Sequence, residues 1–134
     1  MNVIFKSEYW VNIGWSFWQN GYKEKAEYYF NKQIGISNRL IELGRSTQRQ
    51  YEKYLDLALV YAVMGEKEKA YKNLEVYNQK QEMSLYEVNM FKNSPLFDNI
   101  RDEPDFRKVL RDVESKYHAV HEKMKKWLEV QGEL

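Results

Sequence analysis

The sequence predicts an all-α fold built from helical hairpins. Only 2 of the 134 residues are proline and 6 are glycine, so few positions interrupt a helix. Apolar side chains recur three, four and seven residues apart, which is the period of helices with one buried face. We find no run of alternating apolar and polar residues, bounded by turn residues, that would predict a β-strand.

The composition is typical of one folded domain with a modest core. Hydrophobic residues make up 43% of the chain and aromatic residues 16%, which argues against disorder although 31% of the residues are charged. The formal net charge is +1, and basic and acidic residues stay balanced along the chain. No segment supplies the basic stripe that binding to phosphates requires, so we expect no nucleic-acid partner.

The chain contains no cysteine, which excludes disulfides, thiolate metal sites and a cysteine nucleophile. The first ten residues lack the charged region and apolar run of a signal peptide, and no apolar run approaches transmembrane length. We therefore expect a cytoplasmic protein with no membrane partner. If the chain is a domain of a longer protein, however, its N-terminus carries no information about targeting.

The first predicted hairpin covers about the first third of the chain. Ser7 is the expected N-cap of a helix that continues to about Asn20. The Asn20–Gly21 pair ends this helix, and a second helix is expected from near Tyr22 to Gly44. The two helices would form a helix–turn–helix unit.

The second predicted hairpin lies between Tyr51 and Tyr77 and turns at Gly65. Its two helices each carry one apolar face. The small residues Ala58 and Ala70 on these faces would let the two backbones approach closely, with the neighbouring large side chains filling the flanks.

The two hairpins form an internal repeat with a constant offset of 44 residues. The positions Trp10, Ile13, Gly14, Phe17, Gly21, Ala26 and Phe30 correspond, in that order, to Tyr54, Leu57, Ala58, Tyr61, Gly65, Ala70 and Leu74. Seven matched positions at one offset indicate duplicated structural units, which bury their apolar faces against neighbours.

This pattern resembles the tetratricopeptide repeat (TPR). In order, it consists of a large, an apolar, a small and an aromatic residue, followed by glycine, alanine and an aromatic residue or leucine. The usual spacing of that family is about 34 residues. We place the roughly ten extra residues between Gln33 and Gln50, in a longer second helix of the first repeat and its loop. The family's proline near the end of each repeat is absent here.

The resemblance implies a TPR-like helical solenoid fragment that forms a single domain over residues 1–134. Its expected parts are repeat 1 (7–44), repeat 2 (47–82), a short helix and turn (84–101) and a long C-terminal helix (103–131). Ser84 and Glu87 predict a capping box at the start of the short helix, and Ser94 followed by Pro95 predicts a second helix start.

The segment between the short helix and the long helix resembles the tail that closes many bacterial TPR regions. The matching positions are Phe97, Ile100, Arg101, Pro104, Phe106 and Leu110. In those proteins the array is often the C-terminal part of a longer regulator. The resemblance therefore implies a bacterial protein, and an alternative role as the regulatory or sensory domain of a larger signalling or transcriptional protein.

TPR proteins bind partners in a concave groove lined by residues between the packing positions. The groove residues expected from this resemblance are Val11, Trp15, Trp18, Gln19, Leu55 and Leu59. Surplus apolar side chains of this kind are typical of a site for an apolar or amphipathic peptide or helix. The chain's own short third helix or last helix is the other candidate to fill the groove.

The long C-terminal helix carries a second apolar stripe with heptad spacing. Its residues, the expected dimer seam, are Phe106, Leu110, Val113, Tyr117, Val120, Met124 and Trp127. A helix over residues 104–130 would be about 40 Å long, which is longer than packing in a hairpin requires. The seam either folds back along the hairpins or pairs with a second copy in a homodimer, and the spacing is compatible with both.

We expect neither a metal site nor catalysis. His118 and His121 lie one turn apart near Glu114 and Glu122, but no further ligand cluster appears in the sequence. Gly-rich phosphate loops and nucleophile motifs are absent, and the carboxylates alternate with lysines as on solvated helix faces. The sequence thus predicts a non-catalytic scaffold without cofactors that binds a protein or peptide.

Overall fold

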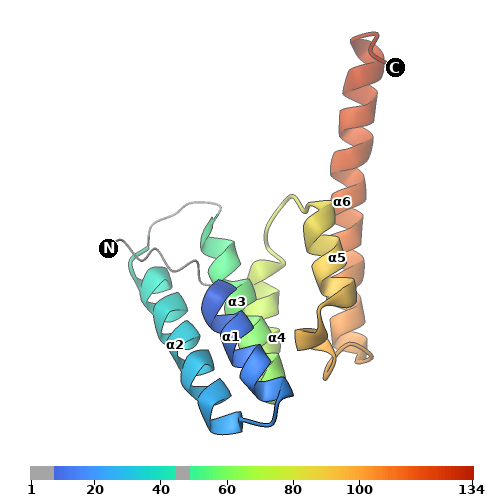
Figure 1. Ribbon diagram of the computed structural model, residues 1–134. Helices are drawn as coiled ribbons and strands as arrows, with labels where there is room; N and C mark the ends of the chain where they lie inside the picture. Colours follow the sequence, from blue (N-terminus) through green and yellow to red (C-terminus); the bar gives the residue numbers. More distant parts are fainter. Residues whose placement is uncertain (1–7, 45–48) are drawn as a thin grey trace. The chain divides into compact units, whose positions relative to one another are not determined.

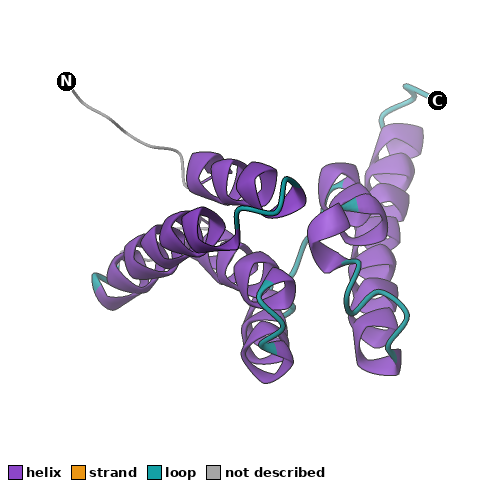
Figure 2. Ribbon diagram, turned by 60° about the horizontal axis from the view of Figure 1, so that its bottom comes forward, coloured by secondary structure: helices purple, strands orange, loops and turns teal. Residues whose placement is uncertain are grey.

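The computed structural model describes residues 8–44 and 49–134. Within these two ranges the chain consists of helices and the turns that connect them, as Figure 2 shows. No strand occurs in the described ranges, and the predicted all-α class is confirmed. The chain forms two compact units, residues 1–77 and residues 78–134.

The first unit contains two helical hairpins (Figure 1). Each of the first three helices packs against the helix that follows it, and the first and third helices are also in contact. The helices are α1 (Glu8–Gln19), α2 (Lys23–Glu42), α3 (Arg49–Val63) and α4 (Lys67–Tyr77). These bounds confirm the expected helix ends near Asn20 and Tyr77, whereas the proposed cap Ser7 lies outside the described residues.

The two hairpins turn in the same way. Gly21 and Gly65 both adopt a positive φ, 82° and 80°, which a residue without a Cβ reaches at little cost. The turns contain two equivalent pairs of hydrogen bonds. Tyr22 N–H donates to Phe17 O in the first turn and Glu66 N–H donates to Tyr61 O in the second, both at 2.9 Å. Gly21 N–H likewise donates to Trp18 O, and Gly65 N–H donates to Ala62 O. These two hydrogen bonds of the second turn lie 44 residues after their counterparts, so the repeat inferred from the sequence extends to the backbone at the turn.

The second helices of the two hairpins differ in length. Helix α2 has 20 residues and α4 has 11, so the first repeat contains the longer second helix that the 44-residue offset predicts. The buried stripe of α2 continues from Phe30 to Gln33 and Ser37, whose side chains hydrogen-bond to each other at 2.8 Å. Leu40 and Leu43 near the end of the helix are exposed.

The packing of α1 on α2 requires a glycine at position 14. A Cβ at Gly14 would lie 2.6 Å from Cδ1 and Cε1 of Phe30 and 3.3 Å from the carbonyl oxygen of Ala26. Both Phe30 and Ala26 are completely buried, so neither has free space to move into. The small residue at this repeat position therefore sets how closely the two helices approach.

Replacing Gly14 with alanine should destabilise the first unit. The new methyl group would overpack the contact with Phe30, and we expect a loss of about 1–3 kcal/mol in the free energy of unfolding, measured by urea denaturation. Gly35→Ala in α2 is the matched control, because nothing lies within 4 Å of its Cβ position. That change should stabilise the protein by up to about 1 kcal/mol through helix propensity. Equal effects of the two changes would contradict the packing argument.

The second unit is built on a cluster of three phenylalanines. Its elements are α5 (Leu85–Asn93), the 3₁₀ turn η1 (Pro95–Phe97) and α6 (Pro104–Val130). The rings of Phe91, Phe97 and Phe106 contact one another, with centroids 5.0–5.9 Å apart. All three are fully buried, together with Ile100 and Val113. Burying these side chains is the main apolar contribution to the unit's stability.

Arg101 holds the end of α5 to the turn that follows. Its guanidinium donates to the carbonyl oxygens of Phe91 (2.7 Å), Lys92 and Ser94, and it forms an ion pair with Asp98 at 3.1 Å. The last carbonyl groups of a helix have no partner inside the helix. The planar fork of one arginine supplies partners for several of them at once.

Replacing Arg101 with alanine should destabilise the second unit by roughly 1–3 kcal/mol, because several carbonyl groups lose a charged donor. Arg101→Lys should recover little of this loss, since an ammonium cannot span the same acceptors. Arg107→Ala is the control: its ion pair with Asp102 is long, 3.4 Å, and exposed, so removing it should change stability by less than about 0.5 kcal/mol. Thermal unfolding followed by circular dichroism would test all three variants.

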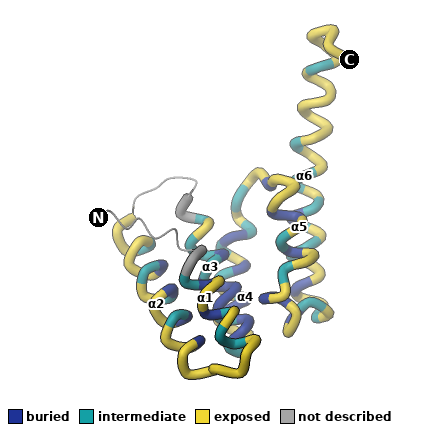
Figure 3. Tube along the Cα trace, in the orientation of Figure 1, coloured by how far each residue is buried: buried dark blue, intermediate teal, exposed yellow. Residues whose placement is uncertain are grey.

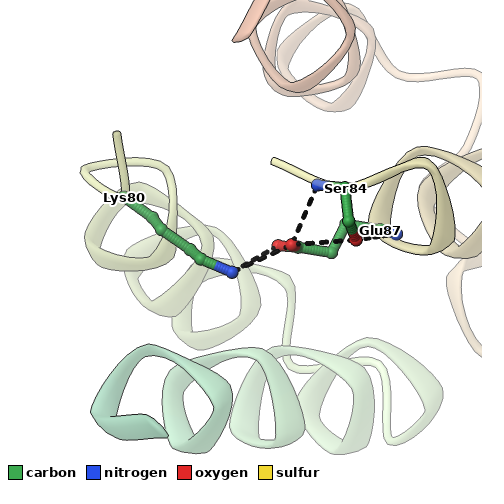
Figure 4. Close-up of polar contacts among 3 residues, drawn as sticks. All are labelled: Lys80, Ser84 and Glu87. Carbon is green, nitrogen blue, oxygen red and sulfur yellow. Dashed lines mark hydrogen bonds and ion pairs between the residues drawn. The ribbon is translucent and has the colours of Figure 1, made fainter. Parts of the chain in front are cut away.

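The start of α5 is fixed by the expected capping box. The Ser84 hydroxyl accepts from the Glu87 N–H (3.3 Å), and the Glu87 carboxylate accepts from the Ser84 N–H (3.1 Å). Figure 4 shows that Lys80 points to the same carboxylate, with its Nζ 2.9 and 3.0 Å from the two oxygens. Glu87 is mostly buried, and these donors compensate for removing its charge from water.

A second polar cluster joins Asn78 to α6. The Asn78 side chain donates to Asp112 (3.0 Å), and Lys116 donates to the backbone and side-chain oxygens of Asn78. Partial burial lowers the pKa of the Lys116 ammonium below its ordinary value, while the charge of Asp112 opposes this shift. The cluster fixes the segment before α5 beside the middle of α6.

Candidate functional site

The structure divides the six predicted groove residues into two groups. Trp15 and Trp18 are half-buried and Gln19 is exposed. The other three are buried, with exposed fractions of 4% for Val11, 7% for Leu55 and 6% for Leu59. The accessible part of the predicted groove is therefore the edge of α1 formed by Trp15, Trp18 and Gln19, which we call the tryptophan edge. Partner binding at this edge stays a prediction.

The tryptophan edge combines an apolar surface with a positive charge. Trp18 and Gln19 lie three and four positions after Trp15, so both are its neighbours on the surface of α1. The Trp18 ring contacts the buried ring of Phe30, with centroids 6.1 Å apart. The Nζ of Lys23 lies 5.3 Å from the centroid of the same indole ring. Trp18 thus contributes to the packing of the hairpin and also offers accessible surface.

A stack of aromatic rings holds α1 on α2 next to this edge. The ring of Tyr29 stacks on Trp10 and on Phe17, with centroids 5.6 Å apart in both pairs. Tyr22 adds an edge-on contact to Phe17, and Tyr28 adds one to Tyr29. These contacts fix the helix that presents Trp15 and Trp18, because stacked rings restrict both sliding and rotation of the helices.

Lysines cover the same rings from the solvent side. The Nζ of Lys25 lies 5.6 Å from the ring centroids of Phe17 and Tyr22, and the Nζ of Lys32 lies 4.8 Å from Trp10 and 4.9 Å from Tyr28. This arrangement of lysines over aromatic rings was not expected from the sequence. Its signal was the recurrence of lysine and tyrosine at positions 25, 28 or 29 and 32, which places them on one face of α2.

The heptad seam of α6 changes from buried to exposed along its length, as Figure 3 shows. Phe106 and Val113 are fully buried, and the two C-terminal members, Met124 and Trp127, are 56% and 58% exposed. The intermediate members, all half-buried, are Leu110, Tyr117 and Val120. The first half of the seam packs inside the second unit, mainly against α5, so the second half is the more exposed part.

The two histidines lie on the exposed side of α6. The ring of Tyr117 lies next to both, with centroids 5.3 Å from His118 and 5.9 Å from His121. Over the described ranges, no group of three or more histidine or acidic side chains is placed to hold a metal ion.

Comparison with known proteins identified no relative. No family model matches the chain, and no curated protein or solved structure matches it either. Of the helices in the described ranges, none combines the length and the apolar character needed to cross a bilayer.

Two accessible apolar surfaces therefore stand out in the described part of the chain: the tryptophan edge of α1 and the C-terminal half of α6. Both surfaces present large side chains. Helix α1 packs against α2 with its other side, and most of the remaining side chains in the C-terminal half of α6 are exposed. Such surfaces are suited to binding another molecule.

Proposed function

We propose that the protein is a non-catalytic, TPR-like interaction module, and that the tryptophan edge of α1 binds an apolar or amphipathic peptide or helix. The main supporting observation is that Trp15 and Trp18 are only half-buried while the neighbouring core residues Val11 and Gly14 are buried. Indole rings that keep accessible surface on a rigid helix are typical of interfaces, where tryptophan often supplies much of the binding energy.

The surroundings of Trp18 favour a particular ligand chemistry. Lys23 places a positive charge over the indole of Trp18, and Gln19 adds an exposed amide to the same edge. A ligand with two apolar side chains one helical turn apart and a nearby carboxylate would match both properties. The stack of Trp10, Tyr29 and Phe17 would keep this edge in place before binding, which lowers the entropic cost of association.

Selection from a library of displayed helical peptides on the intact chain would test this proposal. We expect enriched peptides with apolar residues three or four positions apart and an acidic residue close by. Trp15→Ala and Trp18→Ala should each lower the affinity for the enriched peptides by at least about tenfold, as expected for the loss of a central aromatic contact. Affinity would be measured by isothermal titration calorimetry.

Tyr86→Ala is the matched control, since it removes an exposed aromatic ring from the second unit and should leave peptide affinity unchanged. Circular dichroism separates binding from folding, because Trp18 also contacts Phe30 and its truncation removes some packing. Enriched peptides that bind the folded Trp15 and Trp18 variants as tightly as the parent protein would refute the proposed site.

A further inference from the structure

The C-terminal half of α6 is a helix face without a neighbour in its own unit. Met124 and Trp127 are more than half exposed, and Val130 at the last position of the helix is 82% exposed. Figure 1 shows α6 continuing well past the start of α5, which packs only on its first half. Large apolar side chains left in water in this way favour association with another molecule.

The shape of this face favours a partner helix over a membrane surface. Val120, Met124 and Trp127 continue the same 3-4 spacing that packs inside the second unit nearer the start of α6. The next position with this spacing is Gln131, which is polar. A narrow stripe of this kind is the seam of paired helices, whereas a helix lying in a bilayer interface presents a wide apolar face.

We propose that this half of α6 pairs with the same segment of a second copy, in an antiparallel, two-fold arrangement. The proposal involves only the second unit and is independent of peptide binding by α1. The register that we propose places Met124 against Trp127 of the second copy and Val120 against Gln131 of the second copy. Two-fold symmetry makes each of these contacts occur twice.

The antiparallel direction follows from the position of α5. Helix α5 runs opposite to α6, with Phe91 next to Phe106, so its first residues lie level with the middle of α6 (Figure 1). In a parallel pair the two copies of α5 would lie at the same end of the seam and compete for space. In an antiparallel pair each α5 lies beyond the C-terminal end of the other copy's α6.

Other exposed side chains fit the antiparallel register. Leu85 and Tyr86, at the start of α5, are exposed and would face the end of the second copy's α6, where Val130 is also exposed. The positions that flank the seam bring Lys123 next to Val130 of the second copy. The methylene groups of the lysine can cover this apolar side chain while its ammonium stays in water. No pair of like charges meets across the seam in this register.

Sedimentation equilibrium of the intact chain tests the association. The contact from residue 120 to residue 131 is only about 17 Å long. We therefore expect a weak dimer, with a dissociation constant between about 5 μM and about 500 μM. Trp127→Glu should raise the dissociation constant by at least about tenfold. Lys126→Glu, a charge change at the adjacent exposed position outside the seam, should leave it within about twofold.

Cysteine crosslinking tests the direction, and the chain contributes no cysteine of its own. An equimolar mixture of Val120→Cys and Gln131→Cys should form the mixed disulfide on oxidation, because the antiparallel register places these positions opposite each other. Val120→Cys alone should crosslink poorly, since its two copies would lie about 16 Å apart along the helix axes. Efficient crosslinking of Val120→Cys to itself would indicate a parallel pair and overturn the proposal.

Three further results would overturn the pairing itself. The first is a monomer over the whole concentration range, and the second is a dimer that Trp127→Glu leaves intact. The third is a monomer that binds vesicles of phosphatidylserine and phosphatidylcholine through Trp127, which would assign the face to an anionic lipid surface.

Discussion

The position of α1 on α2 depends on the absence of a side chain at Gly14. The ring of Phe30 occupies the space that a Cβ would need, so the two helices lie at a distance that only glycine allows. At this distance Tyr29 can stack on Trp10 and Phe17, and the stack in turn orients the side of α1 that carries the tryptophan edge. The candidate binding surface of the first unit is therefore a consequence of one close backbone contact.

The second unit achieves its stability by a different means. Helix α5 has only nine residues, and a helix of that length is marginal without help from its surroundings. The capping box with Lys80 supplies hydrogen-bond partners at the start of α5, and Arg101 supplies donors for its last carbonyl groups. The phenylalanine cluster packs against the apolar side of the helix. All these contacts are made to the first half of α6 or to the adjoining turns. The second half of α6 takes no part in them and keeps its seam in water.

Local signals in the sequence predicted the helices well because each depends on a few adjacent residues. Glycine at position 65 defines a turn, and Ser84 with Glu87 defines a helix start, and the structure contains both. Burial was harder to predict, because it depends on how many neighbours cover a face. Leu55 and Leu59 were expected to line a groove and are buried, whereas Leu40 is exposed and the polar Gln33 and Ser37 lie in the core. The heptad spacing of α6 was correctly recognised, but spacing alone does not say which half of a seam has a neighbour.

The longer second helix of the first hairpin adds length only on the side away from the turn. Helices α2 and α4 begin 44 residues apart, so they leave their turns at equivalent positions. Ala26 and Phe30 match Ala70 and Leu74 at the same offset. A residue inserted between Ala26 and Phe30 would rotate one side chain by about 100° relative to the other, whereas length added beyond Phe30 leaves both contacts unchanged. The first hairpin therefore carries a longer second helix, with a buried stripe that continues to Ser37, and keeps the packing next to its turn.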